Sequence, residues 1–188
     1  MVIISLASCD PDDVKNTYTI SGKVNNVYFF IAEPFPGKID SLQFAVNLVS
    51  NDQIIATSDD SVFTFSGLEE GKSYTVIPEQ LGTEGNGISA LDLVMARKYV
   101  EGIEVLDAFQ KLAADVSKNN VVDATDLTLI ENCLLNTEHC FNFRFATDDY
   151  DGIGTGQTDQ YVINNLMSDV TIHFLPINTG DVSGTHNP

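Results

Sequence analysis

A twelve-residue loop from Asp115 to Asp126 is the feature that most constrains how this chain can fold. Oxygen-bearing groups recur in it at the first, third, fifth, seventh, ninth and twelfth positions, namely Asp115, Ser117, Asn119, the Val121 carbonyl, Asp123 and Asp126. Calcium takes roughly six to eight oxygen ligands, and this alternation of ligand and spacer lets one short loop surround the ion. Leu127, Ile130 and Leu134 follow at the spacing of an apolar stripe, which predicts a helix. The pattern therefore predicts a calcium site at the start of a helix.

The loop departs from the strict EF-hand pattern at three positions. Ser117 replaces Asp or Asn, Asn120 replaces Gly, and Asp126 replaces Glu. A hydroxyl is a neutral oxygen ligand, Asn tolerates a left-handed backbone, and Asp can chelate if the loop tightens. We therefore expect calcium affinity of roughly 10⁻⁶ to 10⁻⁴ M, weaker than that of a cytosolic buffer. The alternative is a polar turn before an N-capped helix, because Asp and Thr are also good caps.

A second copy of this unit lies 34 residues upstream, where Ala90, Asp92 and Leu93 match Ala124, Asp126 and Leu127. Duplication at such a period marks two copies of one unit. The upstream copy has only the second half of a loop, and its suitable ligands are the Gly87 carbonyl, Ser89 and Asp92.

The missing half of the upstream loop has a counterpart near the end of the chain. Asp181-Val182-Ser183 repeats the tripeptide Asp115-Val116-Ser117. We therefore predict a split second calcium site in which Asp181 and Ser183 join Gly87, Ser89 and Asp92. Two alternatives stay open: the tripeptide recurs by chance, or Glu84 acts as the substitute ligand.

The half-loop and full loop together resemble the dockerin family. The resemblance rests on ISALDLVMARKYVEGIE followed by KLAADVSKNNVVDATDLTLIENCLL, and it covers roughly residues 81 to 188. The closing FLPINTGDVSG is similar to the end of dockerin-like modules in Gram-negative surface proteins. Membership of this family would imply a pair of calcium-loop and helix units and docking to a cohesin protein. Cellulosomal dockerins often have Ser-Thr before the last ligand, and here only Thr125 matches that pair.

The overall charge excludes one class of partner. Asp and Glu outnumber Lys and Arg by 27 to 9, which gives a net charge of −18. Such a field repels phosphate backbones, so we expect no nucleic acid binding. The same negative charge fits a protein that needs bound cations to be stable. The hydrophobic content of 43% indicates a folded chain.

The N-terminus and the cysteines indicate export. Leu6-Ala7-Ser8-Cys9 resembles the lipobox of a bacterial lipoprotein, although the upstream apolar core is short and has no basic residue. This resemblance implies lipidation at Cys9 and an outer-membrane or cell-surface location. The alternative is an ordinary apolar start with a chance Cys. Cys133 and Cys140 then remain, and they either pair in a disulfide or leave Cys133 as a small core residue.

Strand patterns surround the duplicated unit. Residues 17–80 contain short runs rich in Val, Ile, Phe and Tyr between turn residues, which predicts a β-sandwich. SVFTFSGLEEGKSYTVIPE, residues 61–79, resembles the last hairpin of transthyretin-like or collagen-adhesin B-type repeat domains. Phe141, Phe143 and Phe145 alternate with polar or small residues, which predicts a strand with one buried face. The acidic loop at 146–159 is interpreted as a solvated turn rather than a third cation site.

These patterns predict an α+β fold in four segments. They are a signal and linker at 1–16, a β-sandwich at 17–80, the dockerin-like loop-helix pair at 81–140, and C-terminal strands with a site-closing tail at 141–188. The sequence gives little support for catalysis, since the His residues are scattered and no nucleophile elbow or phosphate loop is present.

Three functions are compatible with this reading. We predict a non-catalytic calcium-binding surface module that binds a cohesin-like or other surface protein during polysaccharide degradation. The alternative is a carbohydrate-binding surface lipoprotein of a glycan-uptake system, which the absence of Trp makes less favourable. A small hydrolase is the least favoured hypothesis.

Overall fold

The computed structural model describes residues 15–25, 43–81, 87–135, 143–153 and 156–184. Within these ranges the chain forms eight strands and three helices, which confirms the predicted α+β class. The elements are β1 (Thr17–Val24), β2 (Gln43–Ser50), β3 (Gln53–Ser58), β4 (Val62–Glu69), β5 (Tyr74–Leu81), α1 (Ala90–Val100), α2 (Ala108–Ala114), α3 (Ala124–Leu134), β6 (Phe143–Thr147), β7 (Tyr161–Ile163) and β8 (Val170–Asn178).

The strands form two four-stranded sheets, which together we call the two-sheet body. The order in the first sheet is β4-β1-β8-β6, and in the second it is β3-β2-β5-β7. Every neighbouring pair is antiparallel except β1 and β8, which run parallel, with Gly22 opposite Ile172. Strands from both sides of the helical region therefore share both sheets. The predicted limits at residues 80 and 141 do not separate the strands into two units.

One apolar core lies between the two sheets. Phe44 of β2 reaches across to β6, where it makes edge contacts with the rings of Phe143 and Phe145 at centroid distances of 5.9 and 5.6 Å. Ile20 and Phe174, on the paired strands β1 and β8, are fully buried in the same cluster. Burying large aromatic and branched side chains is the main favourable term for such a body.

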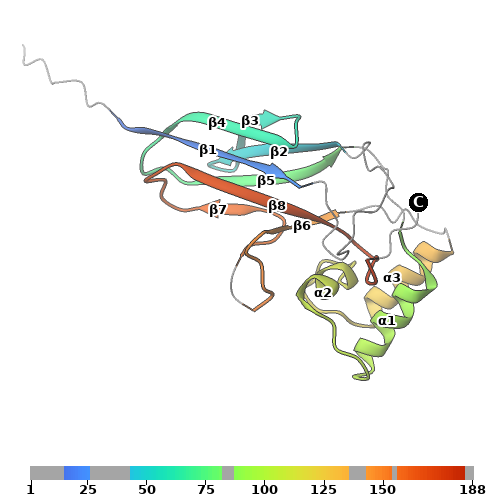
Figure 1. Cartoon of the computed structure of the whole chain (residues 1–188). Helices are drawn as coiled ribbons and strands as arrows, with labels where there is room; N and C mark the ends of the chain where they lie inside the picture. The colour runs from blue at the N-terminus through green and yellow to red at the C-terminus, as the bar shows by residue number, and fades with distance from the viewer. Residues whose placement is uncertain (1–14, 26–42, 82–86, 136–142, 154–155, 185–188) are drawn as a thin grey trace, which may run out of the picture.

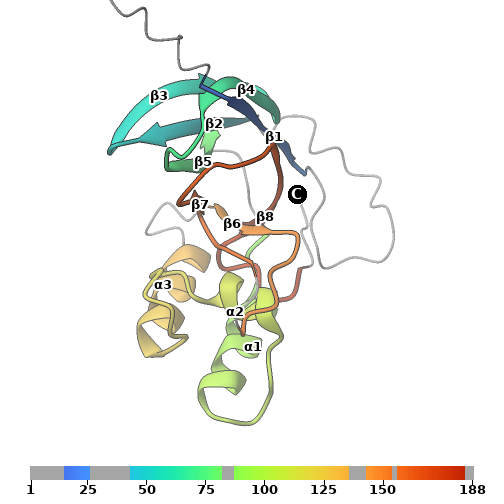
Figure 2. The ribbon, with the colours of Figure 1, turned by 90° about the vertical axis from the view of Figure 1, so that its left-hand side faces the viewer.

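The three helices gather at one end of the two-sheet body, beside β6 and β8 (Figures 1 and 2). There α2 packs on the outer side of these strands through Phe109 and Leu112, which contact Ala146, Leu175 and Ile177. Because of this cover, every residue of β6 is buried. The prediction of a single buried face on this strand was wrong, since alternation reveals a strand's period but not what covers its second face.

A separate apolar core joins the helices to the end of the chain. Ala96 of α1, Ala114 of α2 and Ile130 of α3 are completely buried in it, together with Val182, which follows β8. The C-terminal segment after β8 is thus packed into the helical core, and it connects that core directly to β8 in the two-sheet body.

Candidate metal centre

The Asp115–Asp126 loop connects α2 to α3. Asp115 caps the C-terminus of α2, and Asp123 caps the N-terminus of α3. Between them the backbone turns through Lys118 and Asn120, whose φ angles of 59° and 67° lie in the left-handed region. Asn adopts that region more readily than most residues, so it can stand where the EF-hand pattern has Gly. The loop therefore doubles back tightly enough for its side chains to converge.

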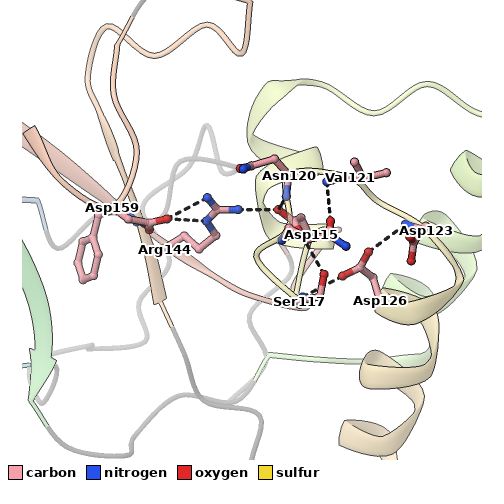
Figure 3. A network of polar contacts seen from close by, with 10 residues as sticks. Asp115, Ser117, Asn120, Val121, Asp123, Asp126, Arg144 and Asp159 are labelled. Atoms are coloured by element: carbon pink, nitrogen blue, oxygen red, sulfur yellow. Dashed lines mark hydrogen bonds and ion pairs between the residues drawn. The ribbon is translucent and has the colours of Figure 1, made fainter.

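Asp115 is the centre around which the first half of the loop winds. Its Oδ1 accepts hydrogen bonds from the Asn119 backbone N at 3.0 Å and from the Ser117 hydroxyl at 3.3 Å. Its Oδ2 accepts one from the Asn120 backbone N at 2.9 Å. The residue is only 3% exposed, so these donors replace the water that a carboxylate needs (Figure 3).

Asp126 closes the loop from the first turn of α3. Its Oδ1 accepts a hydrogen bond from the Ser117 backbone N at 2.9 Å, and its Oδ2 accepts one from the Asp123 backbone N at 2.9 Å. The carboxylate is completely buried. It therefore ties the beginning of the loop to its end, which is the part that the twelfth-position ligand plays in a calcium loop.

The remaining predicted ligands line the outer part of the loop. The Asn119 Oδ1 accepts from the Val121 backbone N at 2.8 Å, and an Asp123 Oδ1 accepts from the Thr125 backbone N at 2.7 Å. The hydrogen bond from Thr125 holds the pKa of Asp123 below its usual value. A carboxylate or amide oxygen that accepts one hydrogen bond keeps a further lone pair.

The donor set fits a hard cation. Its members are three carboxylates, a hydroxyl, an amide oxygen and a backbone carbonyl, which are the ligand types that calcium prefers. In the part of the chain that the structure describes, no group of three or more His, Cys, Asp or Glu side chains forms a metal cluster. Three of the six donors are neutral oxygens, so a calcium site here would use the neutral oxygens as well as the carboxylates.

The second predicted site assembles from two distant parts of the chain. Asp92, in the first turn of α1, accepts at Oδ1 from the Ser183 backbone N at 2.7 Å. Its Oδ2 accepts from the backbone N and the hydroxyl of Ser89, both at 2.7 Å. Asp92 and Asp181 are buried, and Gly87 is buried close by in sequence. The structure thus brings Ser89, Asp92 and Ser183 into direct contact.

The two sites share one hydrogen-bond pattern. In each, the Ser of an Asp-Val-Ser tripeptide donates its backbone N–H to the buried Asp, and the helix N-cap donates to the other oxygen. The tripeptide at 181–183 therefore makes the same contact with the first turn of α1 as the tripeptide at 115–117 makes with the first turn of α3. The Gly180 N–H donates to the Ala113 carbonyl at 2.7 Å and fixes the tail beside α2.

One functional residue that sequence reasoning missed comes from the two-sheet body. The Arg144 side chain projects from β6 into the helical end, where its Nη1 lies 2.7 Å from Asp115 Oδ2. Its Nε and Nη2 contact Asp159 Oδ2 at 3.0 and 2.9 Å (Figure 3). Sequence alternation placed Arg144 on a solvent face. A usable signal was present, because Arg144 is the only Lys or Arg after Lys118 in a strongly acidic chain.

The other predicted residues have simpler outcomes. Cys133, in α3, is disulfide-bonded. Cys9 and Cys140 lie outside the described residues, so the pairing of Cys133 with Cys140 and the lipidation of Cys9 stay predictions. Glu84 also lies outside them. In the acidic loop, Asp151 accepts from the Ile153 backbone N at 2.9 Å, as a turn residue does. Among the described helices, none is long and apolar enough to cross a membrane.

Comparison with known proteins finds a similarity in the helical region. No curated protein matches the chain, and no solved structure does. The family model of the dockerin type I domain matches residues 84–135, a stretch that contains α1, α2, α3 and the Asp115–Asp126 loop. Dockerin domains are non-catalytic, calcium-dependent assembly modules of extracellular or cell-surface proteins, and they bind cohesin partners. The match therefore supports a dockerin module in residues 84–135 of this chain.

Proposed function

We propose that this chain is a calcium-stabilised, non-catalytic surface module that mediates protein–protein assembly in polysaccharide degradation. The observation that carries the proposal is a repeated hydrogen bond, which we call the clamp. In it the Ser117 backbone N–H donates to Asp126, and the Ser183 backbone N–H donates to Asp92. Two clamps of the same kind, one in the matched segment and one completed from outside it, support two calcium sites on one helical unit.

Each site has its own set of proposed ligands. The full loop would use Asp115, Ser117, Asn119, the Val121 carbonyl, Asp123 and Asp126. The split site would use the Gly87 carbonyl, Ser89, Asp92, Asp181 and Ser183. When bound, calcium supplies a divalent charge that offsets the repulsion between buried carboxylates. Binding to a site that exists only in the folded chain adds to folding stability.

The helices that the sites organise would then form the partner surface. Thr125 and Leu91 lie exposed in the first turns of α3 and α1, directly before the buried Asp126 and Asp92. The two clamps fix these helix ends, so the side chains beside them are held in a defined arrangement. A partner that reads this surface would be a cohesin-like protein or another surface protein. Carbohydrate binding is less favoured, because the family match implies protein–protein assembly.

Calcium titration by isothermal calorimetry, after removal of metal with EDTA, tests the two sites. We expect two bound calcium ions in the full chain and a higher Tm in calcium than in EDTA. Deleting residues 180–188 should leave one. Because Val182 is buried in the helical core, the milder variant Asp181→Asn is measured beside the deletion. It should also lose one site, whereas Asp52→Asn, a change in an exposed turn, should keep both.

The calcium part of the proposal fails if the full chain binds no calcium and its Tm is the same in EDTA. The split site alone fails if Asp181→Asn and the deletion both keep two sites.

The partner is tested separately. Binding of immobilised cohesins, lost in EDTA, would support assembly, and binding of immobilised glycans by the same preparation would favour the carbohydrate alternative. We also propose that a lipid on Cys9 anchors the module at the membrane surface. Palmitate labelling in a bacterial host should then be lost in Cys9→Ser. Label that persists in this variant would exclude Cys9 as the anchor.

A further inference from the structure

Arg144 gives the full loop a positive charge that belongs to the chain itself. The side chains of Arg144 and Asp115 are both 4% exposed, and their contact at 2.7 Å is the shortest ion pair among the described residues. Burying a guanidinium is costly unless opposite charges and hydrogen bonds compensate it. Arg144 meets this need by contacting the first residue of the loop on one side and Asp159 on the other (Figure 3).

Asp159 sets the direction of the Arg144 side chain. Its Oδ1 accepts a hydrogen bond from the Phe145 backbone N at 3.0 Å, and its own N–H donates to the Phe145 carbonyl at 2.6 Å. These bonds fix Asp159 against β6, next to Arg144. Its Oδ2 then accepts from two nitrogens of the guanidinium, which leaves Nη1 aimed at Asp115.

Asp115 therefore receives an internal cation at the carboxylate that would also hold calcium. Its Oδ2 is the oxygen that faces Arg144, and its Oδ1 faces the interior of the loop, where Ser117 and Asn119 converge. A positive charge this close stabilises the carboxylate in the absence of metal. The same charge repels a second cation that approaches the same group.

We propose that Arg144 is the built-in counter-ion of the Asp115–Asp126 loop and that Asp159 sets its strength. The proposal rests on the proposed function, in which this loop binds calcium. Arg144 keeps the loop folded when calcium is absent and lowers the affinity of the loop for calcium. Because Arg144 belongs to β6, calcium binding by the helical unit is thermodynamically linked to the two-sheet body.

The role of Asp159 follows from its charge. Asp159 orients the guanidinium through its shape, but its negative charge also competes with Asp115 for the positive charge of Arg144 and so weakens the electrostatic hold of Arg144 on the loop. Without that charge, Arg144 has Asp115 as its only charged partner among the contacts described, and the surroundings of the site also lose one negative charge. Both effects disfavour calcium. Changes at Arg144 and at Asp159 therefore have opposite consequences for calcium affinity, which a general loss of stability would not produce.

The test uses the full chain and four variants, with Tm measured in EDTA and calcium affinity measured by calorimetry. Arg144→Gln keeps a donor but removes the charge, and Arg144→Lys keeps the charge but loses the forked geometry. Asp159→Asn removes the charge but keeps the shape and one oxygen that can accept from the guanidinium, at a positive φ of 61° that Asn tolerates. Arg97→Gln, on the exposed side of α1, is the matched control for loss of an Arg.

We expect Arg144→Gln to lower Tm in EDTA by about 10 °C and to tighten calcium binding at the full loop by roughly tenfold. Arg144→Lys should stay within about threefold of the wild-type affinity, because the charge is kept. Asp159→Asn should weaken calcium binding by about threefold or more. Arg97→Gln should leave both quantities unchanged.

A failure of the proposed function can be distinguished from a failure of this inference alone. If the wild-type chain binds no calcium, the proposed function fails and this inference fails with it. If the wild-type chain binds calcium but Arg144→Gln binds it equally or more weakly, only the inference is overturned. If Arg144→Gln does not fold, Asp159→Asn decides the matter, because the Asp159 side chain is 39% exposed and water can satisfy the donor that the amide no longer accepts. Equal or tighter calcium binding by Asp159→Asn would overturn the inference.

Discussion

The substitution Asp126→Asn tests whether the buried carboxylate closes the loop, independently of any metal. Asp126 accepts the Ser117 N–H on one oxygen and the Asp123 N–H on the other, both at 2.9 Å. An amide of the same shape has only one oxygen. Whichever way it is turned, its NH₂ group faces a backbone N–H, so one buried donor loses its acceptor.

The loss of unfolding free energy in Asp126→Asn follows from these two hydrogen bonds. Losing one hydrogen bond to a charged acceptor costs about 2 kcal/mol, and changing the other from a charged to a neutral acceptor costs about 1 kcal/mol more. We therefore expect the free energy of unfolding to fall by about 3 kcal/mol. For a chain of this length that corresponds to a decrease in Tm of roughly 9 °C.

Urea unfolding in EDTA measures this change without any contribution from bound metal. The matched control is Asp107→Asn, the same chemical change at the exposed N-cap of α2, where Asp107 accepts one bond from the Gln110 N at 2.8 Å. Asn caps helices as well as Asp does, so this variant should lose less than about 0.5 kcal/mol. Equal losses in the two variants, or a loss below about 1 kcal/mol in Asp126→Asn, would refute the assigned role of the carboxylate.

Two further predictions concern the two-sheet body. Gly22→Ala should lower the free energy of unfolding by about 3 kcal/mol in urea, because the new Cβ would lie 1.8 Å from the Ile172 carbonyl oxygen across the β1–β8 pair. Gly67→Ala has open space but a positive φ of 74°, so it should cost only about 1 kcal/mol, and similar losses would argue against the β1–β8 pairing. Burial and the neighbouring Glu70 carboxylate raise the pKa of Tyr18, so its contribution to stability is present below about pH 10 and is lost as the pH rises through its higher folded pKa. Phenolate absorbance should show this titration missing in Tyr18→Phe and shifted to lower pH in Glu70→Gln, and an unshifted midpoint in Glu70→Gln would exclude the influence of Glu70.

Local chemistry made much of the helical unit predictable from the sequence. The ligand spacing between Asp115 and Asp126 lies within twelve consecutive residues, so the loop can be recognised without knowledge of its surroundings. The repeated Asp-Val-Ser tripeptide indicated a position beside Asp92, and the structure places Ser183 there. Repetition carries such information because two copies of one unit need the same donors at equivalent places.

The features that escaped prediction depend on distant contacts. The seven-residue helix α2 has too few turns to show a clear apolar period, and the three-residue strand β7 is shorter still. The inward direction of Arg144 depends on Asp115 and Asp159, which are 29 and 15 residues away. Alternation along β6 reports which residues share a face, but it cannot report that helices cover the second face.

These long-range contacts decide where the functional unit ends. The matched segment 84–135 contains Asp92 and Asp115 but neither of their partners from beyond α3, because Ser183 follows β8 and Arg144 lies in β6. The same segment lacks Val182, which is completely buried in the helical core. A fragment cut at these limits would leave buried carboxylates without their donors and open a gap among Ala96, Ala114 and Ile130. The strands β6 and β8 therefore belong to the proposed calcium-binding unit as much as the helices do, and we expect the smallest piece that can carry the proposed function to include the two-sheet body.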